Sequence, residues 1–177
     1  VLAVLTGPTL LLDATADQAV SGAAITYRAA RIINLGVPNI DTTSYSSVGA
    51  GLRDIGGIVL PANVLGPTGA LRIRVAGTKT GAGGNKTINL RFGGMAFLIN
   101  DTANDTNNWS GEVLITNVNN TAVQRATFTG QNGSIGTTGY VTGTEATTAV
   151  VSIFVRVTPV NAGDTITQTL MVVEIIR

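Results

Sequence analysis

Apolar and polar residues alternate over two neighbouring segments in the middle of the chain. Residues 69–78, GALRIRVAGT, and residues 86–94, KTINLRFGG, each place large apolar side chains at every second position. This period of two predicts β-strands with one buried face. The residues between them, TGAGGN, are glycine-rich and typical of a turn. We therefore predict a β-hairpin whose buried face comprises Leu71, Ile73, Val75, Ile88, Leu90 and Phe92.

Similar patterns continue to the C-terminal end of the sequence. Further strands are predicted over residues 95–100, 112–118, 121–129, 147–158 and 166–177. Turn signals separate them at Asn119–Asn120, at Pro159 and over residues 161–164. With residues 58–60, which run into Pro61, the segment 58–177 offers about eight strands and frequent turns. This is the pattern of an all-β sandwich or barrel, which we take as the main domain.

Residues 1–57 have a different pattern, with short apolar runs among small polar residues and several glycines. The segment 25–35, ITYRAARIINL, alternates at its start and favours a strand over two helical turns. We expect residues 1–57 to form either an extended arm or extra strands added to the sandwich. An arm this rich in Val, Leu and Ile needs a partner surface to cover it.

Charge is sparse along the whole chain. Charged residues make up 12% of the sequence and hydrophobic residues 44%, whereas globular domains have roughly 25% charged residues. This deficit favours a surface that faces other subunits, because homo-oligomer contacts are depleted in charge. The net charge of +1 gives no electrostatic basis for binding nucleic acid or an anionic membrane. No apolar run approaches the ~20 residues of a membrane-spanning helix.

The residue types that carry most catalysis are absent from the sequence. The chain has no His and no Cys, so the commonest general base, the thiol nucleophile and the usual transition-metal ligands are missing. Its ten acidic residues are scattered singly. A glycosidase would need two of them facing each other across a cleft, and such clefts usually carry more than this chain's 5% of aromatic residues. We predict that the protein is not an enzyme and holds no cofactor or metal.

Two segments that resemble ligand sites have simpler explanations. Lys79 and Lys86 flank the glycine-rich residues 80–85, but no phosphate-loop motif joins a strand to a helix there. We interpret the two lysines as solubilising charges at a hairpin tip. Asp101 and Asp105 lie in an oxygen-rich segment that could ligate Ca²⁺. Their spacing matches no EF-hand, and Asn and Asp favour turns for backbone reasons.

Arginines on the predicted strands are candidates for contacts between subunits. Arg72, Arg74 and Arg91 could form a ladder on one face of adjacent strands, pairing with acids of a neighbouring subunit. Arg156 and Glu174 fall on the last two long strands and could form a cross-strand pair.

Two aromatic residues lie in segments predicted as loops. Residues 100–111 are polar and end near Trp109, the only tryptophan, and residues 130–144 are loop-like with room for a short strand at Tyr140. An aromatic side chain in a loop can stack on a sugar or anchor a protein contact. A lone tryptophan can equally cap the edge of the core. Both alternatives stay open for Trp109.

Residues 57–94 resemble a pattern found in virion structural proteins of tailed bacteriophages. In that pattern, an IPAN-x-LG-x-x-G-x-L-R-I segment leads through an Asn/Gly loop into NK-x-(I/V)-x-(V/L)-R-FGG. The residues that match are Pro61, Ala62, Asn63, Leu65, Gly66, Gly69, Leu71, Arg72 and Ile73, followed by Asn85, Lys86, Arg91, Phe92, Gly93 and Gly94. The physical roles expected of the motif are a strand end at Pro61, a corner at Gly66 and Gly69, and a kink or close approach at the Gly-Gly pair.

The resemblance implies a jelly-roll β-sandwich, commonly trimeric, located in a virion that assembles in the bacterial cytoplasm. Such proteins serve as capsid decoration or cement proteins and as modules of tail fibres or head spikes. We expect a decoration protein that binds the major capsid protein or other virion proteins across capsomers. The alternative is a receptor- or glycan-binding module of a tail fibre or spike. The candidate contact residues are Arg72, Arg74, Arg91, Trp109 and Tyr140.

Overall fold

The computed structural model describes residues 31–32, 38–81, 83–102, 107–133 and 135–176. Within these ranges the chain forms twelve β-strands and no helix, so no described helix is long and apolar enough to cross a membrane. The strands are β1 (Arg31–Ile32), β2 (Asn39–Asp41), β3 (Tyr45–Val48), β4 (Arg53–Leu60), β5 (Ala70–Thr80), β6 (Lys86–Phe92), β7 (Met95–Thr102), β8 (Asn107–Asn117), β9 (Gln124–Asn132), β10 (Ile135–Gly143), β11 (Val151–Thr158) and β12 (Thr165–Ile176). Eight of them, β5 to β12, lie wholly within residues 58–177, as the sequence predicts.

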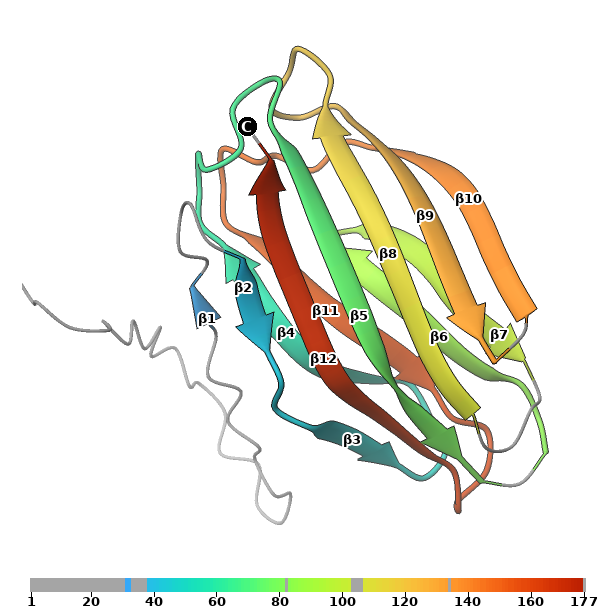
Figure 1. The fold of residues 1–177 in the computed structure, drawn as a ribbon. Coiled ribbons are helices and arrows are strands. Elements are labelled where there is room, and N and C mark those ends of the chain that lie inside the picture. Colours follow the sequence, from blue (N-terminus) through green and yellow to red (C-terminus); the bar gives the residue numbers. More distant parts are fainter. Residues whose placement is uncertain (1–30, 33–37, 82, 103–106, 134, 177) are drawn as a thin grey trace, which may run out of the picture.

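The strands form two sheets that lie face to face (Figure 1). Sheet A has the strand order β1-β4-β11-β6-β7. Sheet B has the order β10-β9-β8-β5-β12-β2, and β3 also pairs with β12. Neighbouring strands are antiparallel, except that β1 runs parallel to β4. The predicted all-β jelly-roll sandwich is confirmed.

Alternating side chains fill the space between the two sheets. The apolar residues predicted on the buried faces of β5 and β6 are at most 2% exposed. Burying a Leu, Ile or Phe side chain contributes about 1.5–3 kcal/mol relative to leaving it in water, so these positions dominate the stability of the fold. Sheet A contributes Ile58, Leu60, Ile88, Leu90, Phe92, Phe97, Ile99, Ile153, Val155 and Val157, and sheet B contributes Leu71, Ile73, Val75, Trp109, Val113, Ile115, Ala126, Ile166, Met171 and Val173.

The predicted hairpin between β5 and β6 is wrong, although both strands and their buried faces are confirmed. β5 lies in sheet B between β12 and β8, while β6 lies in sheet A between β11 and β7. The glycine-rich segment after β5 therefore carries the chain from one sheet to the other, and the two apolar faces belong to opposite walls of the core. Alternation identifies the buried side of a strand, but it does not identify the strand's neighbour.

The two lysines beside this crossing are buried, which contradicts their interpretation as solubilising charges. Lys79 and Lys86 have no exposed surface. Nζ of Lys86 lies 3.4 Å from Oδ1 of Asp164, whose side chain is also fully buried. Oδ2 of Asp164 accepts hydrogen bonds from the backbone N–H groups of Val160 and Asn161. A buried ion pair thus joins the β5–β6 crossing to the β11–β12 turn.

The glycines and proline of the segment 57–94 take the physical roles expected of them. β4 ends immediately before Pro61. The N–H of Gly69 donates to the carbonyl of Gly66 over 3.0 Å and closes the corner. Gly93 has a φ of 54° in the two-residue turn between β6 and β7, where a positive φ matches the twist of the strands. The N–H of Gly94 donates to Oε1 of Glu145 over 2.5 Å, so the backbone there approaches a neighbouring segment closely.

The residues before β5 add strands to both sheets. β1 and β4 belong to sheet A, whereas β2 and β3 pair with β12 in sheet B. The boundary predicted between residues 57 and 58 falls within β4. Of the segment 25–35, only Arg31 and Ile32 are described, and they form β1. Residues 1–30 of the predicted extension, which spans residues 1–57, lie outside the described part of the chain, so the division into an extension and a sandwich stays a prediction.

Two segments predicted as loops are largely strand in their described residues. Residues 100–111 contain the end of β7 and the start of β8, and residues 130–144 contain the end of β9 and all of β10. Their content of Asn, Thr and Gly is typical of turns, yet they pair in regular register, with Asn108 opposite Thr78 and Tyr140 opposite Thr127. Pairing with neighbouring strands overrides local composition here. The short strand considered at Tyr140 is therefore one part of a nine-residue strand.

Arg156 does not pair with Glu174, because β11 and β12 belong to different sheets. Instead it faces Asp54 on β4, with Nε 2.7 Å from Oδ1 and Nη2 3.0 Å from Oδ2. This bidentate contact links neighbouring strands on the outer face of sheet A.

Candidate functional site

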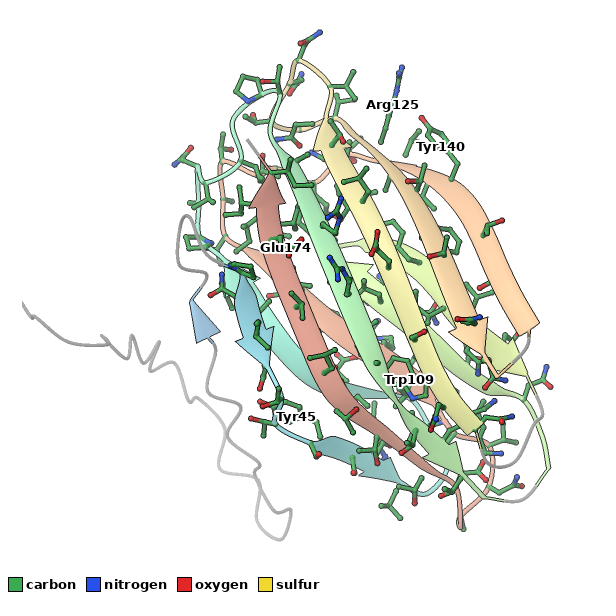
Figure 2. All side chains as sticks on the ribbon, viewed as in Figure 1. Tyr45, Trp109, Arg125, Tyr140 and Glu174 are labelled. Carbon is green, nitrogen blue, oxygen red and sulfur yellow. The ribbon has the colours of Figure 1, made fainter. Side chains whose placement is uncertain are left out.

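The outer face of sheet B carries three of the five predicted contact residues. Arg72 and Arg74 lie on β5 at the positions that alternate with buried apolar residues. Tyr140 lies on β10 and is 58% exposed, and Figure 2 shows it near Arg125 at one end of the sheet. The strand register places Arg72 and Tyr140 in one row across the sheet, which reads Glu174, Arg72, Leu114, Thr127, Tyr140.

The other two predicted contact residues lie elsewhere. Arg91 is on β6 in sheet A, and its Nη2 donates to the carbonyl of Gly94 over 2.9 Å. The predicted ladder of three arginines is therefore wrong, because β5 and β6 are in different sheets. Trp109 is 1% exposed, and its indole N–H donates to the carbonyl of Thr78 over 3.1 Å. Its ring belongs to the core, which supports the core alternative for Trp109 over a role as an exposed stacking residue.

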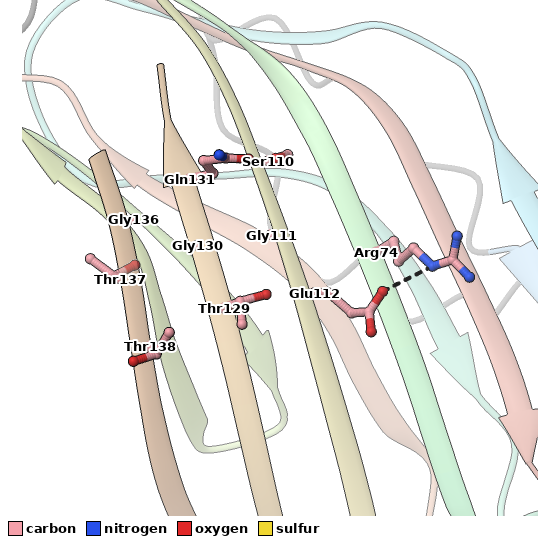
Figure 3. A pocket seen from close by; sticks show the side chains of 10 residues that line it. All are labelled: Arg74, Ser110, Gly111, Glu112, Thr129, Gly130, Gln131, Gly136, Thr137 and Thr138. Carbon is pink, nitrogen blue, oxygen red and sulfur yellow. Dashed lines mark ion pairs between the residues drawn. The ribbon is translucent and has the colours of Figure 1, made fainter. Parts of the chain in front are cut away.

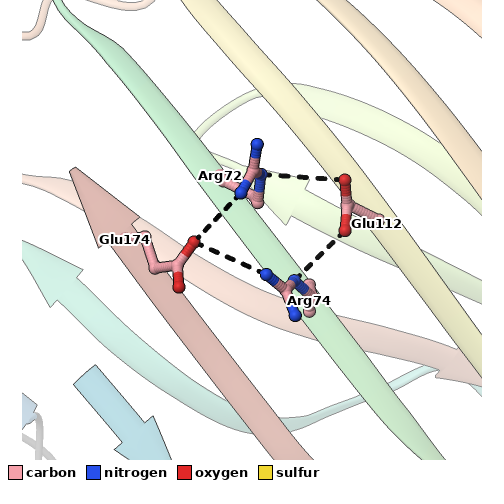
Figure 4. Close-up of polar contacts among 4 residues, drawn as sticks. All are labelled: Arg72, Arg74, Glu112 and Glu174. Carbon is pink, nitrogen blue, oxygen red and sulfur yellow. Dashed lines mark hydrogen bonds and ion pairs between the residues drawn. The ribbon is translucent and has the colours of Figure 1, made fainter. Parts of the chain in front are cut away.

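The two arginines on β5 form a closed ion network with two glutamates from the neighbouring strands (Figure 4). Glu112 of β8 lies 3.7 Å from Nε of Arg72 and 3.1 Å from Nε of Arg74. Glu174 of β12 lies 3.5 Å from Nη1 of Arg72 and 3.7 Å from Nη2 of Arg74. The four side chains are partly exposed, so each pair contributes little stability. Their charges cancel, which leaves this part of the face neutral, and the partners belong to this chain rather than to another subunit.

Beside the network, the face of sheet B is hollowed over β8, β9 and β10 (Figure 3). This first hollow has a volume of about 400 Å³ and is lined by Arg74, Ser110, Gly111, Glu112, Thr129, Gly130, Gln131, Gly136, Thr137 and Thr138. Its lining is rich in hydroxyl and amide groups. No aromatic residue is among them.

Inward-facing glycines let the two sheets approach closely beneath the first hollow. Gly111 and Gly130 lie opposite one another on β8 and β9. A Cβ on Gly111 would lie 2.5 Å from the side chain of Ile99 on β7, and a Cβ on Gly130 would lie 2.1 Å from its carbonyl oxygen. The hydroxyl of Thr137 on β10 also donates to this carbonyl, over 3.2 Å. Sheet B therefore approaches sheet A closely here, and the floor of the first hollow is backbone at Gly111 and Gly130.

A second hollow adjoins the first along the strands. It has a volume of about 540 Å³ and is lined by Ala76, Gly77, Thr78, Asn108, Trp109, Ser110, Gln131, Gly133 and Thr169. A Cβ on Gly77 would lie 2.6 Å from the buried indole of Trp109, so the missing side chain makes room for the ring beneath the floor. Ser110 and Gln131 line both hollows and lie opposite each other on β8 and β9.

The other candidate sites acquire no ligand set from the structure. Among the described residues, no group of three His, Cys, Asp or Glu side chains could hold a metal ion. Asp101 accepts a hydrogen bond from the hydroxyl of Thr87 over 3.0 Å, and Asp105 lies outside the described residues. Lys79 and Lys86 are buried and so do not form an exposed phosphate cradle.

Comparisons with known proteins show no family for this chain. No protein-family model and no curated protein sequence matches the chain. Among solved structures, a seed lectin of Lotus tetragonolobus is similar, with a TM-score of 0.43, 8% identity and coverage of 82% of this chain and 96% of that chain. The carbohydrate-binding module CBM2 of the evolved Dit protein of Lactobacillus casei BL23 phage J-1 has a TM-score of 0.39, 10% identity and coverage of 73% and 74%. Lectin I of Ulex europaeus has a TM-score of 0.39, 12% identity and coverage of 78% and 91%.

Fold and site together define a class of protein. It is an all-β jelly-roll sandwich whose sheet B has a hollowed, polar outer face, on which two arginines and two glutamates cancel each other's charge. The likeness to the solved structures is confined to the arrangement of strands.

Proposed function

We propose that this chain is a non-enzymatic binding module that holds a saccharide on the outer face of sheet B and forms part of a bacteriophage particle. The observation that carries the proposal is the first hollow, a polar depression whose floor is backbone. Because the floor is built from paired strands and inward-facing glycines, the depression exists before a ligand arrives. A preformed site loses little conformational freedom on binding, which favours affinity.

The groups around the first hollow suit a ligand with many hydroxyl groups. Thr129 and Thr138 present hydroxyls, and Gln131 presents an amide with two donor hydrogens and an acceptor oxygen. Such groups can donate to and accept from the hydroxyls of a sugar. Tyr140, in the next row of the sheet, exposes a ring that can pack on the C–H face of a sugar.

The single carboxylate that the described chain places at the two hollows gives no basis for glycoside hydrolysis. Glycoside hydrolysis needs two carboxyl groups on either side of the scissile bond. Glu112 is the one carboxylate among the described residues that line either hollow. It faces the guanidinium groups of Arg72 and Arg74. The site can therefore orient a saccharide, but it presents no acid and nucleophile pair.

The location in a virion and the homotrimeric state rest on the resemblance of residues 57–94 to phage virion proteins. The capsid-decoration role predicted from the sequence rests on the same segment and on the sparse charge. It requires contacts with a capsid protein, and hundreds of copies in each particle would support it. A few copies in each particle would instead support a tail fibre or spike, which agrees better with a saccharide-binding face.

An array of bacterial surface polysaccharides tests the proposed function. Wild-type protein should bind at least one polysaccharide, and Thr138→Ala with Gln131→Ala should abolish that signal. Ser152→Ala, an exposed serine on sheet A, is the matched control and should bind like wild type. Absence of wild-type binding across the array, or equal binding by the double variant, would refute the proposal.

A further inference from the structure

We infer that the outer face of sheet B recognises an uncharged, linear oligosaccharide of at least two residues, with one sugar in each hollow. This inference rests on the proposed function and specifies its ligand. Its basis is that the two hollows are neighbours and share two lining side chains, Ser110 and Gln131.

The spacing of the hollows follows from the strand register. On β5 the first hollow is lined by Arg74, whereas the second begins at Ala76, two residues further along. A strand rises about 3.3 Å per residue, so the offset is about 7 Å. This distance is of the order of one sugar residue in an extended chain. A ligand that follows the strand direction can therefore fill both hollows continuously.

Ser110 and Gln131 stand where the two sugars would be joined. They lie opposite each other on β8 and β9 and border both hollows. Their side chains offer a hydroxyl and an amide, which can bond to hydroxyls or the linking oxygen of either sugar. Beyond them, Asn108 lines the second hollow alone, and Thr138 lines the first alone. The face thus has one shared and two separate sets of polar groups.

The charges of the site favour an uncharged ligand. Arg74 and Glu112 are the charged residues that line the first hollow, and they already face one another over 3.1 Å. The residues that line the second hollow carry no charge. An acidic sugar would have to compete with Glu112 and Glu174 for the arginines, and it would gain little because the network is neutral and partly exposed.

Calorimetric titration with sugars of increasing length tests the inference. The probes are neutral oligomers of glucose, mannose and galactose with one to six residues, and galacturonate oligomers provide the charged counterpart of the galactose series. For a neutral series that binds, affinity should rise about tenfold or more from one residue to two or three and then level off, the equivalent of one to two net hydrogen bonds. The galacturonate series should bind more weakly than the galactose series.

Substitutions in the lining residues test the contribution of each hollow to binding. Asn108→Ala should remove the gain from the second residue and leave binding of the single sugar unchanged, whereas Gln131→Ala should weaken both. Ser152→Ala should change neither. Affinity that does not depend on length, tighter binding of galacturonate, or full retention of the length effect in Asn108→Ala would overturn the inference while leaving saccharide binding intact. Loss of all binding on the polysaccharide array would instead refute the proposed function.

Discussion

Replacing Asp164 with Asn should destabilise the sandwich by about 3 kcal/mol. The carboxylate is fully buried, lies 3.4 Å from Nζ of Lys86 and accepts hydrogen bonds from two backbone N–H groups. Asn has nearly the same shape, and its carbonyl oxygen, placed where Oδ2 lies, can still accept from both of these groups, so the substitution removes mainly the charge. Removing one partner of a buried pair costs about 3–5 kcal/mol. We expect the lower end because the hydrogen bonds from the backbone can be retained.

The same carboxylate predicts a loss of stability in acid. Burial raises the pKa of Asp164, but the backbone N–H groups of Asn161 and Val160 and the Lys86 ammonium together lower it below the usual value. A carboxyl with a lowered pKa in the folded state stabilises the fold above its unfolded pKa of about 3.9. This contribution is lost as pH falls through the folded value. The stability that this group contributes should therefore be constant from about pH 5 to 7 and decrease below about pH 4.

Urea unfolding followed by the fluorescence of Trp109, the single tryptophan, measures both effects. Wild type, Asp164→Asn, Lys86→Met and the double variant should be compared at pH 7 and pH 3. The double variant should lose less free energy than the sum of the single variants, by about 1–3 kcal/mol. The difference between wild type and Asp164→Asn should narrow at pH 3. A cost below about 1 kcal/mol at pH 7, or the same cost at both pH values, would contradict the role assigned to the pair.

Three further substitutions test the packing and the polar contacts of the sandwich by the same urea assay. Gly130→Ala should lower the free energy of unfolding by about 1–3 kcal/mol, because its Cβ would lie 2.1 Å from the carbonyl oxygen of Ile99. The control Gly163→Ala, whose Cβ would have nothing within 4 Å, should be near neutral. Equal effects of the two substitutions would refute the close approach of the sheets. Gln124→Ala should lower the free energy of unfolding by about 1–3 kcal/mol, since its buried amide forms hydrogen bonds with the side chain of Asn117 and with the backbone of Glu145, between β10 and β11. An effect below about 0.5 kcal/mol would contradict a structural role for these hydrogen bonds. Arg156→Met breaks the partly exposed ion pair between Arg156 and Asp54, and it should lower the free energy of unfolding by less than about 1 kcal/mol, in a salt-dependent way. A loss above about 2 kcal/mol would show that the pair is more shielded from solvent than its exposure implies.

The sequence predicts the strands and their buried faces well because those properties are local. Alternation assigned Leu71 and Ile88 to the core, and Pro61 marked the end of β4. Strand pairing depends on distant parts of the chain, so the alternation within β5 and β6 does not reveal that the two strands belong to different sheets. The same limitation hid the buried pair of Lys86 and Asp164, which are brought together from different parts of the sequence only by the crossing between sheets.

In the candidate site, too, local features can be predicted from the sequence and contacts between distant residues cannot. The outward direction of Arg72 and Arg74 follows from alternation, but their partner Glu174 lies 102 residues from Arg72 in the sequence and could not be assigned. The sequence does carry a signal for the hollows. Gly77 and Gly111 occupy positions in the apolar register of β5 and β8, where a missing side chain indicates a close approach of backbone.

A map of backbone amide chemical shifts shows directly whether a saccharide binds to the outer face of sheet B. The probe is the neutral polysaccharide with the strongest array signal, cut to fragments of two to four residues and titrated into labelled wild-type protein. We expect the largest shifts on the floor and walls of the hollows, at Gly111, Gly130 and Gln131, with small shifts on sheet A. Shifts that cluster on sheet A or at the ends of the sandwich, or no shifts at all, would contradict it.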